Sequence, residues 1–210
     1  MRTHLLLIGL GTFHCAAGPF INLTFDEPDL SGPLIPAYPG GPLRGNTDQI
    51  LRGWTVTLAG EVQSTMYYSP PGIGSGGPVN LWQRDPGAMS PFGPYEVFMA
   101  SRFPEQPEIR LSQTATIPDD AKFLWILSLG YVEAYADGTK IGEVNPVQGT
   151  FGFLNVAPYE GKDVSLEFVL PPGLATRFDI VGFTSVPEPS TWALLGLGLG
   201  ALVWHFRRQR

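Results

Sequence analysis

Residues 163–170 read DVSLEFVL, an alternation of polar and apolar side chains. The even-numbered residues, Val164 to Leu170, are all apolar, whereas Asp163, Ser165 and Glu167 are polar. A period of two is typical of a strand with one buried and one solvated face. Pro171 and Pro172 follow, and proline has no N–H to donate to a ladder. The stretch therefore predicts a half-buried antiparallel strand.

The same period continues outward over residues 18–185, with turn residues about every 8–12 positions. Asp137-Gly138, between residues 131–136 and 139–144, is a strong hairpin signal. We expect further strands at 20–25, 54–59, 62–68, 95–100, 108–113, 122–129, 151–156 and 178–183. About ten short strands without a helical stripe predict an all-β fold, a single antiparallel β-sandwich. Trp54, Phe123 and Trp125 occupy strand positions, so we expect them in its core.

Residues 1–17 are typical of a secretory signal peptide. Arg2 gives a basic start, an apolar run covers residues 5–13, and Cys15 and Ala17 place small side chains before Gly18. Nine apolar residues form a helix of about 14 Å, too short to cross a bilayer. We expect cleavage between Ala17 and Gly18; the alternative is a buried N-terminal strand or helix.

A second apolar segment lies near the C-terminus. Residues 192–206 carry no formal charge, and Arg207, Arg208 and Arg210 follow at once. With Ser190 and Thr191 the segment reaches about 25 Å, the lower limit for a spanning helix. We expect a transmembrane helix over residues 190–206 and, from the positive-inside rule, a basic tail (207–210) in the cytoplasm.

Pro187, Glu188 and Pro189 stand just before this helix. A Pro-Glu-Pro triplet (within residues 186–190), a short apolar helix and a terminal arginine cluster together resemble the PEP-CTERM sorting signal of Gram-negative bacteria, over residues 186–210. The resemblance implies processing by an exosortase-type membrane protease. It also implies a precursor held transiently in the inner membrane and a mature form at the cell surface or outside the cell. An ordinary C-terminal anchor is the alternative, but it does not account for the triplet.

The positions of the rare residues limit the chemistry. His4, His14, Cys15 and His205 all fall in the two terminal segments. Residues 18–189 therefore lack the parts of a Ser-His-Asp triad, a Cys-His pair or a typical catalytic zinc site. They carry nine of the 13 basic residues against all 19 acidic ones, a net charge of −10, which disfavours nucleic acid as a partner. We expect no catalysis; a glycosidase-like carboxylate pair is the remaining enzymatic alternative.

Residues 111–183 resemble the galactose-binding-like jelly rolls common in carbohydrate-binding modules. The likeness lies in hydrophobic spacing and turns: LSQTATIP at 111–118, the Asp137-Gly138 hairpin, VAPYEG at 156–161 and FDI at 178–180. It implies a jelly-roll sandwich, in which the first and last strands can share a structural Ca²⁺ through oxygen ligands. Carboxylates stand at these places in this chain: Asp26, Glu27, Asp29 and Asp179. For the first three, the alternative is a solvated turn.

Aromatic side chains near loops are candidates for stacking on sugar rings. Tyr67, Tyr68, Trp82 and Tyr95 lie in or beside Gly/Pro-rich segments, and of these Tyr67 and Trp82 are the candidate ligand-binding residues. Residues 72–77 match G-x-G-x-x-G, but flanking prolines and the lack of a following helix indicate a flexible loop. We therefore expect a non-catalytic exported surface or extracellular-matrix protein. The alternative is a carbohydrate-binding module that recognises exopolysaccharide.

Overall fold

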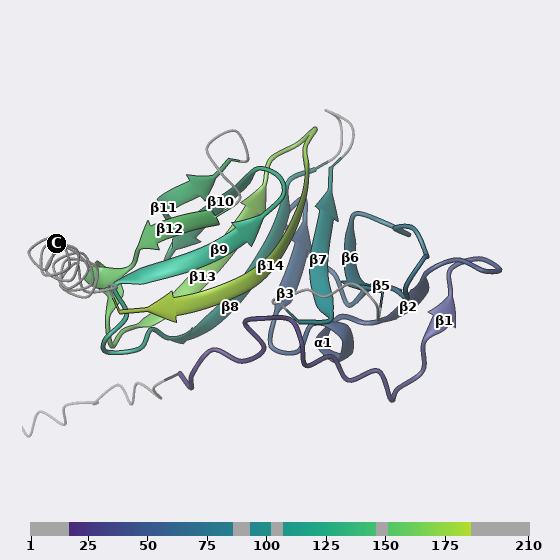
Figure 1. Ribbon diagram of the computed structural model, residues 1–210, viewed down its shortest axis with the longest axis horizontal. Coiled ribbons are helices and arrows are strands. Elements are labelled where there is room, and N and C mark those ends of the chain that lie inside the picture. Colours follow the sequence, from purple (N-terminus) through teal and green to yellow (C-terminus); the bar gives the residue numbers. More distant parts are fainter. Residues whose placement is uncertain (1–16, 86–92, 102–106, 146–150, 186–210) are drawn as a thin grey trace, which may run out of the picture.

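The computed structural model describes residues 17–85, 93–101, 107–145 and 151–185 (Figure 1). Most of the predicted signal peptide and the predicted transmembrane helix lie outside these residues, so the structure does not test either prediction. Within the described ranges, no helix combines the length and the apolar character that crossing a bilayer requires.

The described residues form two stacked β-sheets, which confirms the predicted sandwich (Figure 1). The large sheet has eight strands, in the spatial order β1 (Ile35–Pro36), β2 (Leu43–Asn46), β5 (Thr65–Ser69), β6 (Val79–Gln83), β7 (Tyr95–Ala100), β14 (Ala175–Thr184), β9 (Phe123–Ser128) and β12 (Phe151–Asn155). The small sheet has six, in the order β11 (Thr139–Val144), β10 (Val132–Ala136), β13 (Asp163–Leu170), β8 (Ile109–Thr116), β3 (Thr55–Leu58) and β4 (Glu61–Val62). All strand pairs are antiparallel except β5 with β6. The helical elements described are one α-helical turn, α1 (Thr47–Ile50), and one 3₁₀ turn, η1 (Ala157–Tyr159).

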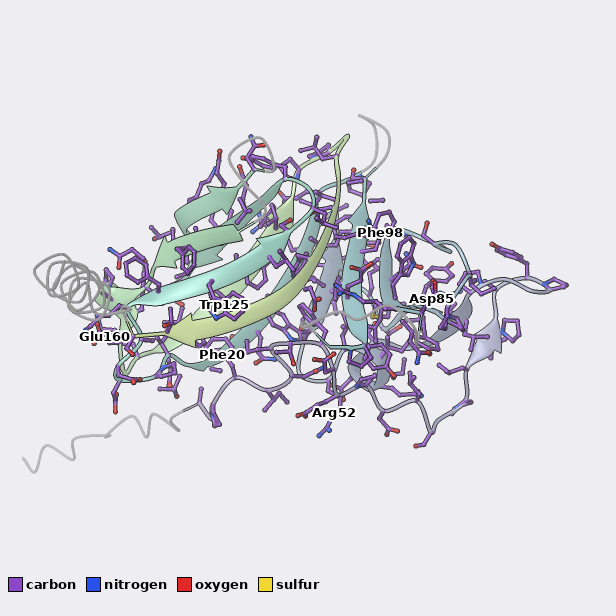
Figure 2. All side chains as sticks on the ribbon, in the orientation of Figure 1. Phe20, Arg52, Asp85, Phe98, Trp125 and Glu160 are labelled. Carbon is purple, nitrogen blue, oxygen red and sulfur yellow. The ribbon has the colours of Figure 1, made fainter. Side chains whose placement is uncertain are left out.

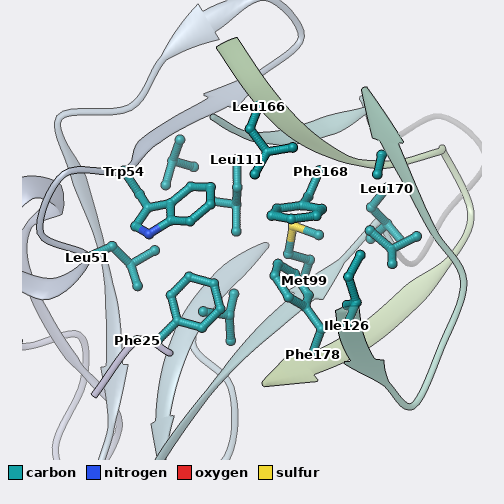
Figure 3. Packing of buried hydrophobic residues seen from close by; sticks show 14 of the residues in the cluster. Phe25, Leu51, Trp54, Met99, Leu111, Ile126, Leu166, Phe168, Leu170 and Phe178 are labelled. Atoms are coloured by element: carbon teal, nitrogen blue, oxygen red, sulfur yellow. The ribbon is translucent and has the colours of Figure 1, made fainter. Parts of the chain in front are cut away.

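The strand β13 lies between β10 and β8, where both of its edges are paired. Its even-numbered side chains are buried, as the alternation predicts. Phe168 packs against Trp54, with ring centroids 5.7 Å apart, and against Phe178 of β14 at 5.4 Å (Figure 3). Phe25 contacts both Trp54 and Phe178, so four aromatic rings join the two sheets in one core.

The strand predicted at residues 20–25 is wrong. Asn22 and Phe25 adopt left-handed backbone conformations with φ of 51° and 59°, which a strand does not contain. The Phe25 N–H donates to the Asn22 carbonyl at 3.1 Å, closing a turn that directs the Phe25 ring into the core. Three strands were not predicted, β1, β2 and β6, because none shows a sustained alternation.

The burial predicted for Phe123 and Trp125 is also wrong, whereas Trp54 is 3% exposed as expected. Leu124 and Ile126 occupy the inward positions of β9 and are fully buried. Since successive side chains of a strand point to opposite faces, Phe123 and Trp125 lie on the outer face of the large sheet, where they are half-buried.

Candidate binding face of the large sheet

Aromatic side chains gather on the outer face of the large sheet. The strand register fixes their side: Phe98 of β7 pairs with Arg177 of β14, and Trp125 of β9 pairs with Phe153 of β12. Figure 2 shows Phe98 and Trp125 well apart on this sheet, and their β14 partners, Arg177 and Gly182, lie five residues apart along that strand. We call the outer positions Trp82, Phe98, Phe123, Trp125, Leu127 and Phe153 the aromatic face.

The candidate ligand residue Trp82 stacks on Phe98, with ring centroids 5.1 Å apart and planes inclined by 16°. The guanidinium carbon of Arg177 lies 5.5 Å from the Trp82 ring centroid, a cation–π distance. The indole is half-buried, and its buried Nε1 has no hydrogen-bond partner among the residues that the structure describes. One face of Trp82 is thus already occupied by Phe98, so a ligand has access to only part of the ring.

A network of charges surrounds this stack. Arg84 pairs with Asp179 and, at 3.1 Å, with Glu96, while Arg177 pairs with Glu96 at 3.2 Å. Asp179 is 2% exposed, and within the described part of the chain its Oδ1 has no hydrogen-bond partner. Burial raises the pKa of Asp179 to about 7, against the attraction of Arg84 and with further repulsion from Asp26 and Glu96. Asp179 is therefore a structural carboxylate beneath the surface.

The structure brings only part of the predicted calcium set together. Asp26 lies near enough to Asp179 to repel it, and burial raises the pKa of Asp26 as well. Glu27 is exposed, and Asp29 is exposed and accepts hydrogen bonds from the Ser31 N–H at 3.0 Å and the Ser31 hydroxyl at 2.6 Å. Among the described residues, no three His, Cys, Asp or Glu side chains are grouped closely enough to hold a metal. The calcium site stays a prediction.

The other candidate ligand residue, Tyr67 on β5, lies against the glycine-rich loop. A Cβ on Gly77 would stand 2.3 Å from the Tyr67 ring, so glycine is what allows this contact. Asn80 anchors the loop, because its Oδ1 accepts from the Gly76 N–H at 2.9 Å and its Nδ2 donates to the Gly77 carbonyl at 2.7 Å. The loop and Tyr67 thus cover one end of the sheet, and the phosphate cradle that its sequence matches is not formed there.

The Trp125 part of the aromatic face was not predicted. A Cβ on Gly182 of β14 would stand 2.5 Å from Nε1 of Trp125, so the indole lies over a strand position that has no side chain. Phe153, on the neighbouring strand β12, is 61% exposed. A glycine inside a strand pattern, as in FDIVGF at 178–183, signals such a close approach and could have located this site.

Of the predicted processing residues, Ala17 and Gly18 lie within the described part of the chain. The Ala17 N–H donates to Asp163 at 2.8 Å, and the Ala17 carbonyl accepts from the Thr116 hydroxyl at 2.6 Å. Gly18 is exposed. The remaining processing residues lie outside the described residues: Pro187, Glu188, Pro189, Arg207, Arg208 and Arg210.

A comparison with solved structures found one low similarity. A solved structure of TmCBM61 in complex with beta-1,4-galactotriose is similar to this chain with a TM-score of 0.38 and 14% sequence identity, covering 64% of this chain and 89% of that one. No curated protein matches the chain.

Residues 185–209 match the family model of the PEP-CTERM protein-sorting motif, the signal of exported proteins processed by an exosortase. The chain therefore carries a PEP-CTERM sorting motif at residues 185–209, which confirms the prediction from the Pro-Glu-Pro triplet and the arginine cluster.

Proposed function

We propose that this protein is a non-catalytic surface or extracellular-matrix protein, exported through its signal peptide and processed by an exosortase-type protease. The position of the sorting motif carries this proposal. The last strand, β14, ends at Thr184, which pairs with Phe123 of β9, and the motif begins at the next residue. A folded β-sandwich thus leads directly into the segment that the protease reads. In the precursor, residues 190–206 span the inner membrane and the arginine tail stays in the cytoplasm.

The state of the carboxylates supports a non-catalytic role. Glu96 pairs with Arg84, Glu133 with Lys140 at 2.7 Å, and Glu167 with Arg110 at 2.7 Å. A glycosidase needs two carboxyl groups that face each other across a bound sugar, one of them free to give up a proton. Asp179 has a raised pKa suited to an acid, but it is buried under Arg84. These carboxylates stabilise the sandwich instead.

The test of this proposal replaces Pro187, Glu188 and Pro189 with alanine in a host that contains the sorting protease. Each proline fixes φ and disfavours helix in the preceding residue, so the native triplet presents extended peptide bonds to a protease. We expect the triple variant to be exported but to accumulate as a full-length membrane species. Cell fractionation and intact mass measure this, with the wild type in a host lacking the protease as the control. Equal release of variant and wild type would contradict the proposal.

The second candidate function is that of a carbohydrate-binding module that recognises exopolysaccharide, built on a galactose-binding-like jelly roll. The aromatic face is the observation that favours it. Phe153 is largely exposed and the other rings of the face are half-buried, and a contiguous apolar patch on a folded surface is typical of a binding site. Retardation of the protein in a native gel that contains a soluble polysaccharide tests this function.

A further inference from the structure

The Trp125 part of the aromatic face is built beside a strand position that has no side chain. The five-membered ring of the indole lies over Gly182, where any other residue would place a Cβ against it. On the other side of β9, Phe153 pairs with Trp125 and is 61% exposed. Trp125 lies in front of the β9–β14 pair in Figure 2.

We propose that Trp125, Phe153 and Gly182 form a platform that stacks against the sugar rings of a neutral polysaccharide. This inference rests on the carbohydrate-binding candidate function above and gives that function its site. A pyranose ring has faces made of C–H groups and a rim of hydroxyls. Flat aromatic rings fit such faces, as binding sites combine apolar walls with a few polar groups that fix orientation.

The charge of the site selects a neutral ligand. The outer positions of β9 and β12 that flank the platform are Phe123, Leu127 and Asn155, none of which ionises. The domain around them carries a net charge of −10 over residues 18–189. A polyanion such as a uronic-acid polymer, or an anionic lipid surface, would be repelled over about 10 Å at moderate salt. An uncharged glycan meets no such repulsion.

The length of the aromatic face indicates an oligosaccharide stretch of the polymer. From β12 to β6 there are four strand intervals, or about 19 Å across the strands, and the face is longer than this because Arg177 and Gly182, the β14 partners of Phe98 and Trp125, lie five residues apart along β14. At the far end, Arg177 is 41% exposed and pairs with Glu96 through one guanidinium nitrogen. A guanidinium offers five N–H donors in a planar fork, so Arg177 has donors to give to hydroxyl groups. Trp82 and Phe98 beside it extend the apolar surface.

The experiment is affinity electrophoresis of the protein recovered from its exporting host. Native gels contain hydroxyethyl cellulose, a soluble β-galactan or, as the acidic comparison, polygalacturonate. We expect at least one neutral polymer, and not polygalacturonate, to retard the wild type. Trp125→Ala, Phe153→Ala and Gly182→Ala should each weaken this binding about 10-fold or more, the loss typical of a central aromatic contact. Gly182→Ala adds only a methyl group, but that group displaces the indole.

The matched control is Tyr38→Ala, which removes an aromatic side chain that is 54% exposed, outside the aromatic face. It should leave retardation unchanged. Thermal melting separates misfolding from lost binding, and Phe153→Ala keeps the test valid if Trp125→Ala fails to fold, because Phe153 is largely exposed.

Three results would overturn the inference. If a neutral polymer retards the wild type and all platform variants equally, the site is wrong but the carbohydrate-binding function stands. If neither neutral polymer retards the wild type, that candidate function fails together with the site, while the role of the sorting motif is unaffected. If the platform variants instead abolish self-association, or sedimentation with phosphatidylcholine vesicles, the face binds a second copy or a membrane.

Discussion

The outer faces of the two sheets differ in the hydrogen bonds and ion pairs that their side chains form. On the small sheet, Glu133 accepts hydrogen bonds from Tyr131 at 2.8 Å and from Tyr135 and Lys140 at 2.7 Å. Lys140 and Tyr131 also donate to Glu143 at 2.7 Å. On the large sheet, half-buried or exposed aromatic rings lie at outer positions beside an ion-pair network in which Glu96 and Asp179 are buried.

This difference indicates which of the two sheets is suited to bind a partner. The polar groups of the small sheet satisfy one another and need only water outside them. The aromatic face leaves apolar rings at the surface, which costs solubility and needs a reason such as binding. The two sheets share one core, and the candidate site lies on the large sheet.

The largest effect that separates the two faces should come from Arg84→Met. This variant leaves the buried Asp179 without its cation and Glu96 with Arg177 alone, and an unpaired buried charge typically costs about 3 kcal/mol or more. On the small sheet, Arg110→Met removes partly exposed ion pairs to Glu108 and Glu167, worth about 0–1 kcal/mol. Urea unfolding at pH 8 measures both. Equal losses of unfolding free energy in the two variants would show that Asp179 and Glu96 are not buried.

The two faces should also respond to pH in opposite directions, by about 1–2 kcal/mol each. Burial raises the pKa of Asp179 to about 7 from an ordinary 3.8, so its contribution to stability grows as pH falls from 7 toward 4. For Glu133, burial acts to raise the pKa, but hydrogen bonds led by that from Lys140 outweigh it and lower the pKa to about 2 from 4.5. Its contribution is therefore complete above pH 4.5 and is lost as pH falls toward 2.

Two amide variants test these signs by thermal melting across pH 2–8. Asp179→Asn should stabilise the protein relative to wild type above pH 7 and lose that advantage near pH 4. Glu133→Gln should destabilise it at pH 7 and match the wild type near pH 2. Parallel pH profiles for the wild type and both variants would mean that neither carboxyl titrates differently in the folded state.

Calcium binding should have a smaller effect on stability, and it tests the buried carboxylate Asp179 together with Asp26. A cation that binds the folded state raises its stability by mass action, by about 1 kcal/mol for modest affinity. If Asp26 and Asp179 can hold Ca²⁺, millimolar calcium should raise the melting temperature, and more so in Arg84→Met, where the competing guanidinium is gone. Arg110→Met is the control. Identical melting in EDTA and in excess calcium for both variants would end the calcium prediction.

The smallest effect should come from Phe153→Ala on the large sheet, and the small sheet offers Tyr131→Phe for comparison. Phe153→Ala removes a largely exposed ring and should change the unfolding free energy by less than about 0.5 kcal/mol. Tyr131→Phe removes hydrogen bonds to Glu133 and Glu143 and should cost about 0.5–1.5 kcal/mol. If Phe153→Ala costs more than Tyr131→Phe, the aromatic face supports the fold and is not reserved for a ligand.

The sequence predicted the parts of this contrast that depend on local pattern. The alternation over 163–170 and the Asp137-Gly138 turn each identify a strand or hairpin, and both are confirmed. In β9 the run FLWIL is apolar at every position, so nothing local shows that Leu124 and Ile126 point inward while Trp125 points out. The pairing of Arg84 with Asp179 joins residues 95 positions apart, which only the sheet register brings together.

The most direct test of the account is the intact mass of the protein released by a host that has both secretion and the sorting protease. The account predicts a chain that begins at Gly18 and ends within residues 186–190, so that both terminal segments are gone and the β-sandwich remains whole. A released chain that still begins at Met1, or that still ends at Arg210, would contradict it.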